Sequence, residues 1–259
     1  MLCHFRNITK WVKILHPVSK SGQIYSFRLC VQLLCLLSFC QFFVGCTTSK
    51  KEALVPPVKA SKTYLALGDS YTIGQGVLQT ERFPYLAAQW LTTQGVDMLS
   101  PTYIATTGWT TADLLRGIAN TNPPSNFDAV TLLIGVNNQF QGRDTNEYRR
   151  EFTQCLQEAI RLARNKTQHV FVLSIPDYSS TPVGRRFDSA SVSAGVNRFN
   201  AINRQITEQY RVVYIDITPG SRQASTDPGL VASDGLHPSG REYEKWAALL
   251  APAMVKVLK

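Results

Sequence analysis

The sequence predicts an α/β protein with a mainly parallel, five-stranded sheet. Short apolar runs with strand character alternate with segments in which apolar residues recur at helical spacing. Two of the runs, at 127–134 and 170–175, are almost continuously apolar, as expected of strands that helices cover on both faces. Alternation of this kind is typical of parallel sheets, because each pair of parallel strands needs a crossover connection.

The expected elements follow one another through residues 64–258. Strands are expected at 64–67, 98–105, 127–134, 170–175 and 212–217. Helices are expected at 83–91, 112–119, 146–164, around 196–210, and from about Ser239 onward. Each helix is assigned from apolar residues three or four apart, which form one stripe on a helix surface. Residues 178–191 are rich in Ser, Pro, Gly and Arg, which predicts a loop.

The first 45 residues differ from the rest in composition and predict an export signal. They carry five basic residues and no acidic residue, and residues 29–44 form an apolar run directly after Arg28. This run includes Gln32, Ser38 and Gln41 and is shorter than the roughly 20 apolar residues of a membrane-spanning helix. The pattern is typical of a signal peptide.

Residues 43–46, Phe-Val-Gly-Cys, resemble the box of a bacterial lipoprotein signal, in which a cysteine is lipidated and becomes the mature N-terminus. Cys46 is therefore the predicted lipidation site, and its acyl chains would hold the protein on a membrane of the bacterial cell envelope. Residues 46–62 are polar and lack periodicity, which predicts a tether. The predicted organisation is a signal peptide at 1–45, this tether, and a folded domain at 63–259. An uncleaved anchor and a secreted form without lipid are the alternatives.

Charge and cysteine content argue against several function classes. The formal charge of +9 falls to +4 without residues 1–45, because 22 basic and 18 acidic residues remain. These are scattered, so no nucleic-acid partner is expected. Cys155 alone lies in the predicted domain, on an apolar helical stripe, and is expected to be a buried core residue. No Cys/His cluster has the spacing of zinc ligands, and neither a metal nor a cofactor is expected.

The predicted domain contains the residue types of nucleophilic catalysis. Ser70 follows an expected strand directly, and Asp234 and His237 lie three residues apart before the last helix. A serine hydroxyl needs a base to take its proton, and the base works best when an acid orients it. Besides His237, the mature chain has one other histidine, His169, which opens an expected strand and suits a structural role. Elimination therefore favours His237 as the base.

Each of these residues also has a simpler explanation. Gly-Asp-Ser suits an ordinary turn, Asp234 precedes a glycine in a pair that is common in turns, and His237 precedes a Pro-Ser pair that starts a helix. The pattern Gly-x-Ser-x-Gly is absent, which disfavours the nucleophile elbow of α/β-hydrolases. We favour the catalytic interpretation because the candidate nucleophile, base and acid occur together in one domain.

Four ordered blocks of residues 64–258 resemble the SGNH, or GDSL, hydrolase family. The blocks are Gly68-Asp69-Ser70-Tyr71-Thr72-Ile73-Gly74, Thr106-Thr107-Gly108-Trp109-Thr110-Thr111, Gly135-Val136-Asn137-Asn138, and Asp234 with His237. The third block departs from the family's usual Gly-x-Asn-Asp, because Asn138 replaces the aspartate. The resemblance implies a flavodoxin-like, three-layer α/β/α fold and identifies residues 63–259 as the hydrolase domain.

The resemblance also implies a mechanism. Ser70 would attack an ester or thioester carbonyl while His237 takes its proton and Asp234 orients the imidazole. The oxyanion would be held by the backbone N–H groups of Ser70 and Gly108 and by the side-chain amide of Asn137. The expected substrate is a small-molecule, glycan or lipid ester. An O-acetyltransferase acting on envelope glycans and a non-catalytic ligand-binding lipoprotein are the alternatives.

Three charged residues near these blocks are given lesser roles. Asp69 is expected to brace its loop through hydrogen bonds rather than to act on substrate. Arg185 and Arg186, in the predicted loop at 178–191, could meet an anionic substrate, but a solvated loop face is the simpler expectation.

Overall fold

A five-stranded parallel sheet forms the middle layer of the computed structural model, which describes residues 60–259. Its strands are β1 (Tyr64–Gly68), β2 (Thr102–Ala105), β3 (Ala129–Leu133), β4 (Val170–Leu173) and β5 (Val213–Ile215). The order across the sheet is β2-β1-β3-β4-β5, and every neighbouring pair is parallel. The strand order reverses at β1, so the loops that follow β1, β2 and β3 meet at one edge of the sheet. The predicted signal peptide and Cys46 lie outside the described residues.

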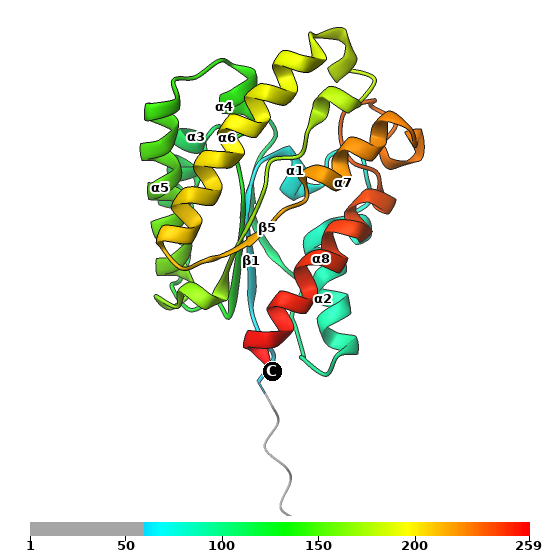
Figure 1. The fold of residues 1–259 in the computed structure, drawn as a ribbon. Coiled ribbons are helices and arrows are strands. Elements are labelled where there is room, and N and C mark those ends of the chain that lie inside the picture. Colours follow the sequence, from blue (N-terminus) through cyan, green and yellow to red (C-terminus); the bar gives the residue numbers. More distant parts are fainter. Residues whose placement is uncertain (1–59) are drawn as a thin grey trace, which may run out of the picture. The chain divides into compact units, whose positions relative to one another are not determined.

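Helices cover both faces of the sheet (Figure 1). One layer holds α2 (Phe83–Thr93) and α8 (Gly240–Leu258), which pack against each other. The other layer holds α3 (Thr111–Thr121), α5 (Thr145–Leu162) and α6 (Ser189–Gln209). This confirms the predicted three-layer α/β/α arrangement.

Short helical segments fill most of the connections. The α-helical ones are α1 (Ser70–Ile73), α4 (Val136–Phe140) and α7 (Thr218–Ser221). The 3₁₀ turns are η1 (Gln79–Glu81), η2 (Thr167–His169), η3 (Tyr178–Ser180), η4 (Gly184–Arg186), η5 (Arg222–Ser225) and η6 (Pro228–Leu230). The sequence does not predict these segments, because three to five residues are too few to show a helical stripe.

The central strands are the elements that the sequence predicts best. Every residue of β1, β3 and β4 is buried, as the continuous apolar runs indicate. The two edge strands are shorter than predicted. Within the expected strand at 98–105, Met98 forms a single bridge with Lys62, and regular pairing starts only at Thr102. Pro101 lies between them and lacks the N–H group that a ladder needs, which accounts for the interruption.

Two helices begin earlier in the chain than their apolar stripes indicate, because side chains cap their N-termini. The Thr110 hydroxyl accepts a hydrogen bond from Asp113 N, and the Asp113 carboxylate accepts one from Thr110 N, so α3 starts at Thr111. Asp188 caps α6, which therefore begins inside the segment predicted as a loop at 178–191. Within the described part of the chain, no helix has both the length and the apolar content that crossing a bilayer requires.

Candidate active site

The sequence-predicted site residues meet at the carboxyl ends of the strands. Ser70 follows β1 as the first residue of α1, Gly108 lies between β2 and α3, and Asn137 lies on α4 after β3. Asp234 and His237 lie in the connection between η6 and α8. Because β1 is flanked by β2 and β3, the first three residues come from adjacent strands, and the loop before α8 brings the acid and the histidine to them.

Ser70, His237 and Asp234 form a continuous chain of contacts. His237 Nε2 lies 3.0 Å from Ser70 Oγ, and His237 Nδ1 lies 2.6 Å from Asp234 Oδ2. Both are hydrogen-bond distances. Ser70 and His237 are almost fully buried, with 5% and 6% of their surfaces exposed. When Nδ1 carries the ring hydrogen and donates it in a hydrogen bond to the carboxylate, Nε2 is free to accept the serine proton.

Asp234 combines the two roles that the sequence left as alternatives. Its Oδ1 accepts hydrogen bonds from the backbone N–H groups of Leu236 and His237, at 2.9 and 3.0 Å, which stabilises the turn. Its Oδ2 is left to contact the imidazole. Burial by itself raises the pKa of Asp234, but the hydrogen bonds from Leu236 and His237 outweigh burial and lower the pKa below its usual value. The side chain is therefore a carboxylate at neutral pH.

The imidazole is also held by packing. The ring of Tyr71 lies 5.4 Å from the ring of His237, and the Tyr71 backbone carbonyl accepts a hydrogen bond from the Tyr243 hydroxyl on α8, at 2.9 Å. Trp246, also on α8, contacts the Tyr243 ring edge-on and lies 6.3 Å from the Tyr71 ring, centroid to centroid. The last helix thus supports both the base and the segment that carries Ser70.

Asp69 braces the turn before Ser70, as expected. Its Oδ1 accepts a hydrogen bond from Tyr71 N at 3.0 Å and caps α1, and 1% of the residue is exposed. Burial raises the pKa of Asp69 to about 7. The folded protein therefore holds this proton more tightly than the unfolded chain does, and the stability that Asp69 contributes falls as the pH rises from about 4 to about 7.

Replacing Asp69 with asparagine should remove this pH dependence, because the amide oxygen can keep the hydrogen bond from Tyr71 while no charge is buried. We expect the free energy of unfolding of Asp69→Asn, relative to wild type, to increase by up to about 4 kcal/mol between pH 4 and pH 8. Urea unfolding at a series of pH values measures it. A difference that does not change with pH would contradict the assignment.

The candidate oxyanion donors lie on three neighbouring segments, which follow β1, β2 and β3. Gly108 has a φ of +82°, in the left-handed region that glycine adopts freely, and a Cβ there would meet no atom within 4 Å. The Asn137 amide donates one hydrogen bond to the Trp109 carbonyl, at 2.9 Å. An amide nitrogen carries two hydrogens, so the second is available to a ligand. Gly108, Asn137 and Ser70 line the same pocket.

Gly135 makes the turn that delivers Asn137. It has a φ of +123°, and a Cβ at this position would lie 2.2 Å from the Tyr148 hydroxyl oxygen. No other residue type fits both the conformation and the space. The Tyr148 hydroxyl donates to Asn203 on α6, at 2.6 Å, so the strand-to-helix turn rests on the helix layer below it.

An apolar pocket of about 290 Å³ opens beside Ser70 and His237. Its aromatic and aliphatic walls come from α1, from α4, from the segment 178–187 and from the turn before His237. They consist of Tyr71, Val136, Phe140, Tyr178, Val183, Phe187 and Leu236. Phe140 and Phe187 are 58% and 46% exposed, and their rings meet edge-on with centroids 5.7 Å apart. These two rings form an exposed aromatic rim at the pocket.

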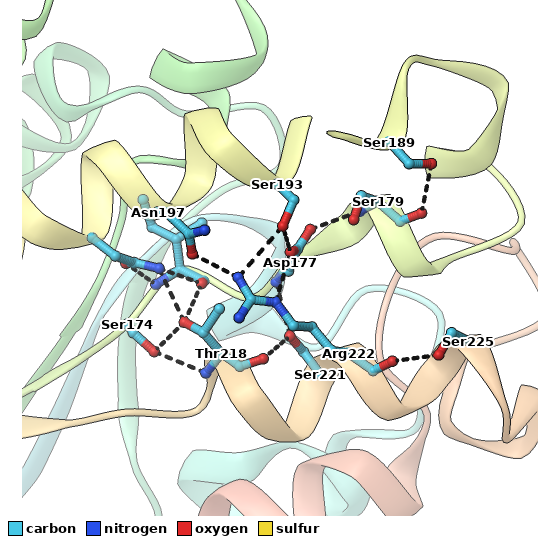
Figure 2. A network of polar contacts seen from close by, with 12 residues as sticks. Ser174, Asp177, Ser179, Ser189, Ser193, Asn197, Thr218, Ser221, Arg222 and Ser225 are labelled. Atoms are coloured by element: carbon cyan, nitrogen blue, oxygen red, sulfur yellow. Dashed lines mark hydrogen bonds and ion pairs between the residues drawn. The ribbon is translucent and has the colours of Figure 1, made fainter. Parts of the chain in front are cut away.

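A polar network fixes the start of the segment that carries Tyr178 and Phe187, as Figure 2 shows. Asp177 Oδ2 accepts hydrogen bonds from the Ser193 hydroxyl and from Arg222 Nε, at 2.6 and 2.9 Å, and Oδ1 accepts one from Ser179 N at 3.0 Å. Burial raises the pKa of Asp177, but these hydrogen bonds outweigh burial and lower the pKa. The buried carboxylate is thus ionised and ties the pocket wall to α6 and η5.

The Asp177 network could not be predicted from the sequence, because the partners of Asp177 lie 16 and 45 residues away and follow no motif. The structure agrees with three other expectations. Cys155 is fully buried, His169 Nδ1 contacts the Asp128 carbonyl outside the site, and Arg185 and Arg186 are exposed and do not line the pocket. Among residues 60–259, no group of His, Cys, Asp and Glu side chains is placed to hold a metal ion.

The model of the GDSL-like Lipase/Acylhydrolase family matches residues 66–245. No curated protein matches the chain.

Solved structures share the fold at low sequence identity. The lipase Lip_vut3 from a goat rumen metagenome is 19% identical with a TM-score of 0.62, over 77% of this chain and 100% of its own. The lipase/acylhydrolase from Enterococcus faecalis is 20% identical with a TM-score of 0.57, over 76% and 97%. The SGNH-hydrolase family esterase AlinE4 is 23% identical with a TM-score of 0.52, over 78% and 99%. The family model covers most of the chain, so the chain belongs to the GDSL-like lipase/acylhydrolase family and is an enzyme that acts on ester bonds.

Proposed function

We propose that the protein hydrolyses a carboxylic ester or thioester through an acyl intermediate on Ser70. The observation that carries the proposal is the chain from Asp234 through His237 to Ser70, with contacts of 2.6 and 3.0 Å, beside an apolar pocket. Ser70 Oγ attacks the carbonyl carbon while its proton passes to His237 Nε2. The bond to the alcohol or thiol then breaks, and His237 returns the proton to the leaving group. Water, activated by His237, hydrolyses the acyl-serine and releases the acid.

The developing charges have candidate partners. The backbone N–H groups of Ser70 and Gly108 and the free hydrogen of the Asn137 amide would hold the oxyanion, and the Asp234 carboxylate would stabilise the imidazolium. Loss of one oxyanion donor typically costs on the order of 10²–10³ in kcat.

A fluorophosphonate probe tests the proposal. We expect the probe to label the peptide that contains Ser70. The rate of p-nitrophenyl butyrate hydrolysis should fall in proportion to the labelled fraction of the protein. Hydrolysis that continues when Ser70 is fully labelled would contradict the mechanism. An acylated sugar, formed in place of free acid when an acetylated donor and a glycan acceptor are supplied, would favour the O-acetyltransferase. Neither labelling nor turnover would favour a binding function.

The apolar lining of the pocket favours a substrate whose acyl group is apolar. Seven of its thirteen lining residues are the aromatic and aliphatic side chains named above, and none of the thirteen is Asp, Glu, Lys or Arg. A chain of several methylene groups would bury its surface there, at about 25 cal/mol for each Å². An acetyl group is short, so we expect it to contact the aromatic rim of Phe140 and Phe187 less than a longer acyl chain does.

Shortening the rim should therefore affect long acyl chains selectively. We expect Phe140→Ala and Phe187→Ala each to lower kcat/KM for a p-nitrophenyl octanoate by about fivefold, which corresponds to about 1 kcal/mol of lost apolar burial. Hydrolysis of the acetate should change less than about twofold. Leu249→Ala, which truncates an exposed apolar residue of α8, is the matched control. Equal losses on both esters would show that the rim does not contact the acyl chain.

We also propose that the protein is exported and anchored at the bacterial cell envelope by lipid on Cys46. The basic residues, the apolar run and the small residues before Cys46 support this placement. Cell fractionation tests it, because Cys46→Ala should move the protein out of the membrane fraction. An unchanged membrane fraction would contradict lipid anchoring at this residue.

A further inference from the structure

Asn138 follows the candidate oxyanion residue Asn137 but contacts a different part of the protein. It is 2% exposed. Its Oδ1 accepts a hydrogen bond from Thr111 N at 3.0 Å, and its Nδ2 donates to Thr111 Oγ1 at 2.8 Å. The Thr111 hydroxyl in turn donates to a carboxylate oxygen of Glu151 on α5. Three side chains from α4, α3 and α5 thus form one chain of hydrogen bonds.

The Glu151 carboxylate, at one end of this chain, fixes the direction in which each hydrogen bond is donated. A carboxylate has no hydrogen to donate, so the Thr111 hydroxyl must give its single hydrogen to Glu151. Thr111 Oγ1 can then only accept from residue 138, and the Asn138 amide is the group that donates. An ionised aspartate, the residue usual at this position in the family, could not donate. Asparagine at position 138 and glutamate at position 151 therefore match each other.

The chain holds the loop that carries the oxyanion donors. The Asn137 amide binds the Trp109 carbonyl at 2.9 Å, and Asn138 binds both the backbone and the hydroxyl of Thr111. The segment from Gly108 to Thr111 is thereby attached to α4 at two points, through Trp109 and through Thr111. The separation between the Gly108 N–H and the Asn137 amide depends on these attachments.

We infer that Asn138, Thr111 and Glu151 are positioning residues that set the geometry of the oxyanion hole through a hydrogen-bond chain of fixed direction. The inference rests on the proposed function, because it assumes that Gly108 and Asn137 face an oxyanion. Groups of this kind act on the charge that develops in the transition state, so disturbing them lowers kcat more than it raises KM.

Asn138→Asp is the first test, although it restores the residue usual in the family. The new carboxylate competes with Glu151 for the single Thr111 hydrogen, and one of the two carboxylates loses its donor. We expect kcat for p-nitrophenyl butyrate to fall about 10-fold, with KM changed less than about twofold, because a misplacement of 1 Å can cost on the order of 10²-fold. Steady-state kinetics measures both constants.

Adding Glu151→Gln to Asn138→Asp should reverse the direction of the hydrogen bonds in this chain and restore activity. The new glutamine amide can donate to Thr111 Oγ1, and the Thr111 hydroxyl can then donate to the aspartate at position 138. We expect kcat of N138D/E151Q to return to within about threefold of wild type. Glu158→Gln is the matched control, since Glu158 lies on the same helix in a surface pair with Arg161, and N138D/E158Q should stay as slow as N138D.

Thr111→Val keeps the shape of residue 111 and removes the hydroxyl. The kcat of this variant should fall as that of N138D does. Adding Glu151→Gln should not restore it, because no hydroxyl at residue 111 remains to change its hydrogen-bond direction. Thermal unfolding of each variant separates loss of fold from loss of positioning. If Asn138→Asp does not fold, Thr111→Val decides, and wild-type kcat in folded Thr111→Val would overturn the inference.

Two further results would overturn it. One is wild-type kcat in folded N138D, and the other is a double variant N138D/E151Q as slow as N138D itself. Failure of the proposed function looks different, because the wild-type protein would then neither turn over the ester nor label at Ser70, and both proposals would fall together.

Discussion

Ser70→Ala is expected to lower kcat/KM for p-nitrophenyl butyrate by roughly 10⁴-fold or more, since removing the nucleophile of a serine hydrolase leaves only the contribution of the oxyanion hole and of substrate binding. No other hydroxyl contacts His237 among the described residues, so no neighbour can take over the attack. Initial rates with purified protein measure the loss. The fluorophosphonate label should disappear in the same variant.

The fold of Ser70→Ala should be unchanged, which makes the result specific. Helix α1 is capped by Asp69 rather than by Ser70, and among residues 60–259 the serine hydroxyl is hydrogen-bonded to His237 alone. The thermal midpoint should therefore stay within a few degrees of wild type. Ser125→Ala, at an exposed position in the connection before β3, is the control and should keep wild-type rates and labelling. Residual activity above about 1% in Ser70→Ala would mean that another group attacks the ester.

The sequence predicted the fold best where burial is complete. Strands β1, β3 and β4 are covered on both faces and therefore appear as unbroken apolar runs. The edge strands β2 and β5 are partly exposed, so their ends depend on pairing partners and on Pro101, which no periodicity reports. The short helices α1, α4 and α7 exist because a chain leaving a parallel strand must turn, and their length leaves no pattern.

The candidate site likewise has residues that the sequence predicts and residues that it does not. Ser70, Asn137, Asp234 and His237 could be picked out because their blocks are local in the sequence. Their convergence follows from the strand order, which no local pattern encodes. The aromatic rim and the Asp177 network could not be predicted, because Phe140 and Phe187 come from separate segments and Asp177 reaches Arg222 across 45 residues. The sequence itself shows that Asn138 departs from the family pattern, but its connection to Glu151 through Thr111 is visible only in three dimensions.

Asp234→Asn is expected to lower kcat for p-nitrophenyl butyrate by roughly 10³–10⁴-fold, because the equivalent loss in a serine triad leaves the imidazole in the wrong tautomer. The new amide oxygen can keep the hydrogen bonds from the backbone N–H groups of Leu236 and His237, so the turn and the fold should survive. The amide nitrogen then faces His237 Nδ1 and donates to it. The ring proton moves to Nε2, which can no longer accept the proton of Ser70.

The size of this loss distinguishes orientation of the base from support of the turn, the two explanations that the sequence left open. A turn residue alone would be replaced by asparagine at little cost, since asparagine suits such turns as well as aspartate does. Asp227→Asn is the matched control, because Asp227 lies just before η6, caps it and pairs with Arg241 at the surface. The kcat of this variant should change less than about twofold. If Asp234→Asn retained more than a tenth of wild-type kcat, Asp234 would be a turn residue, and His237 would act without an orienting acid.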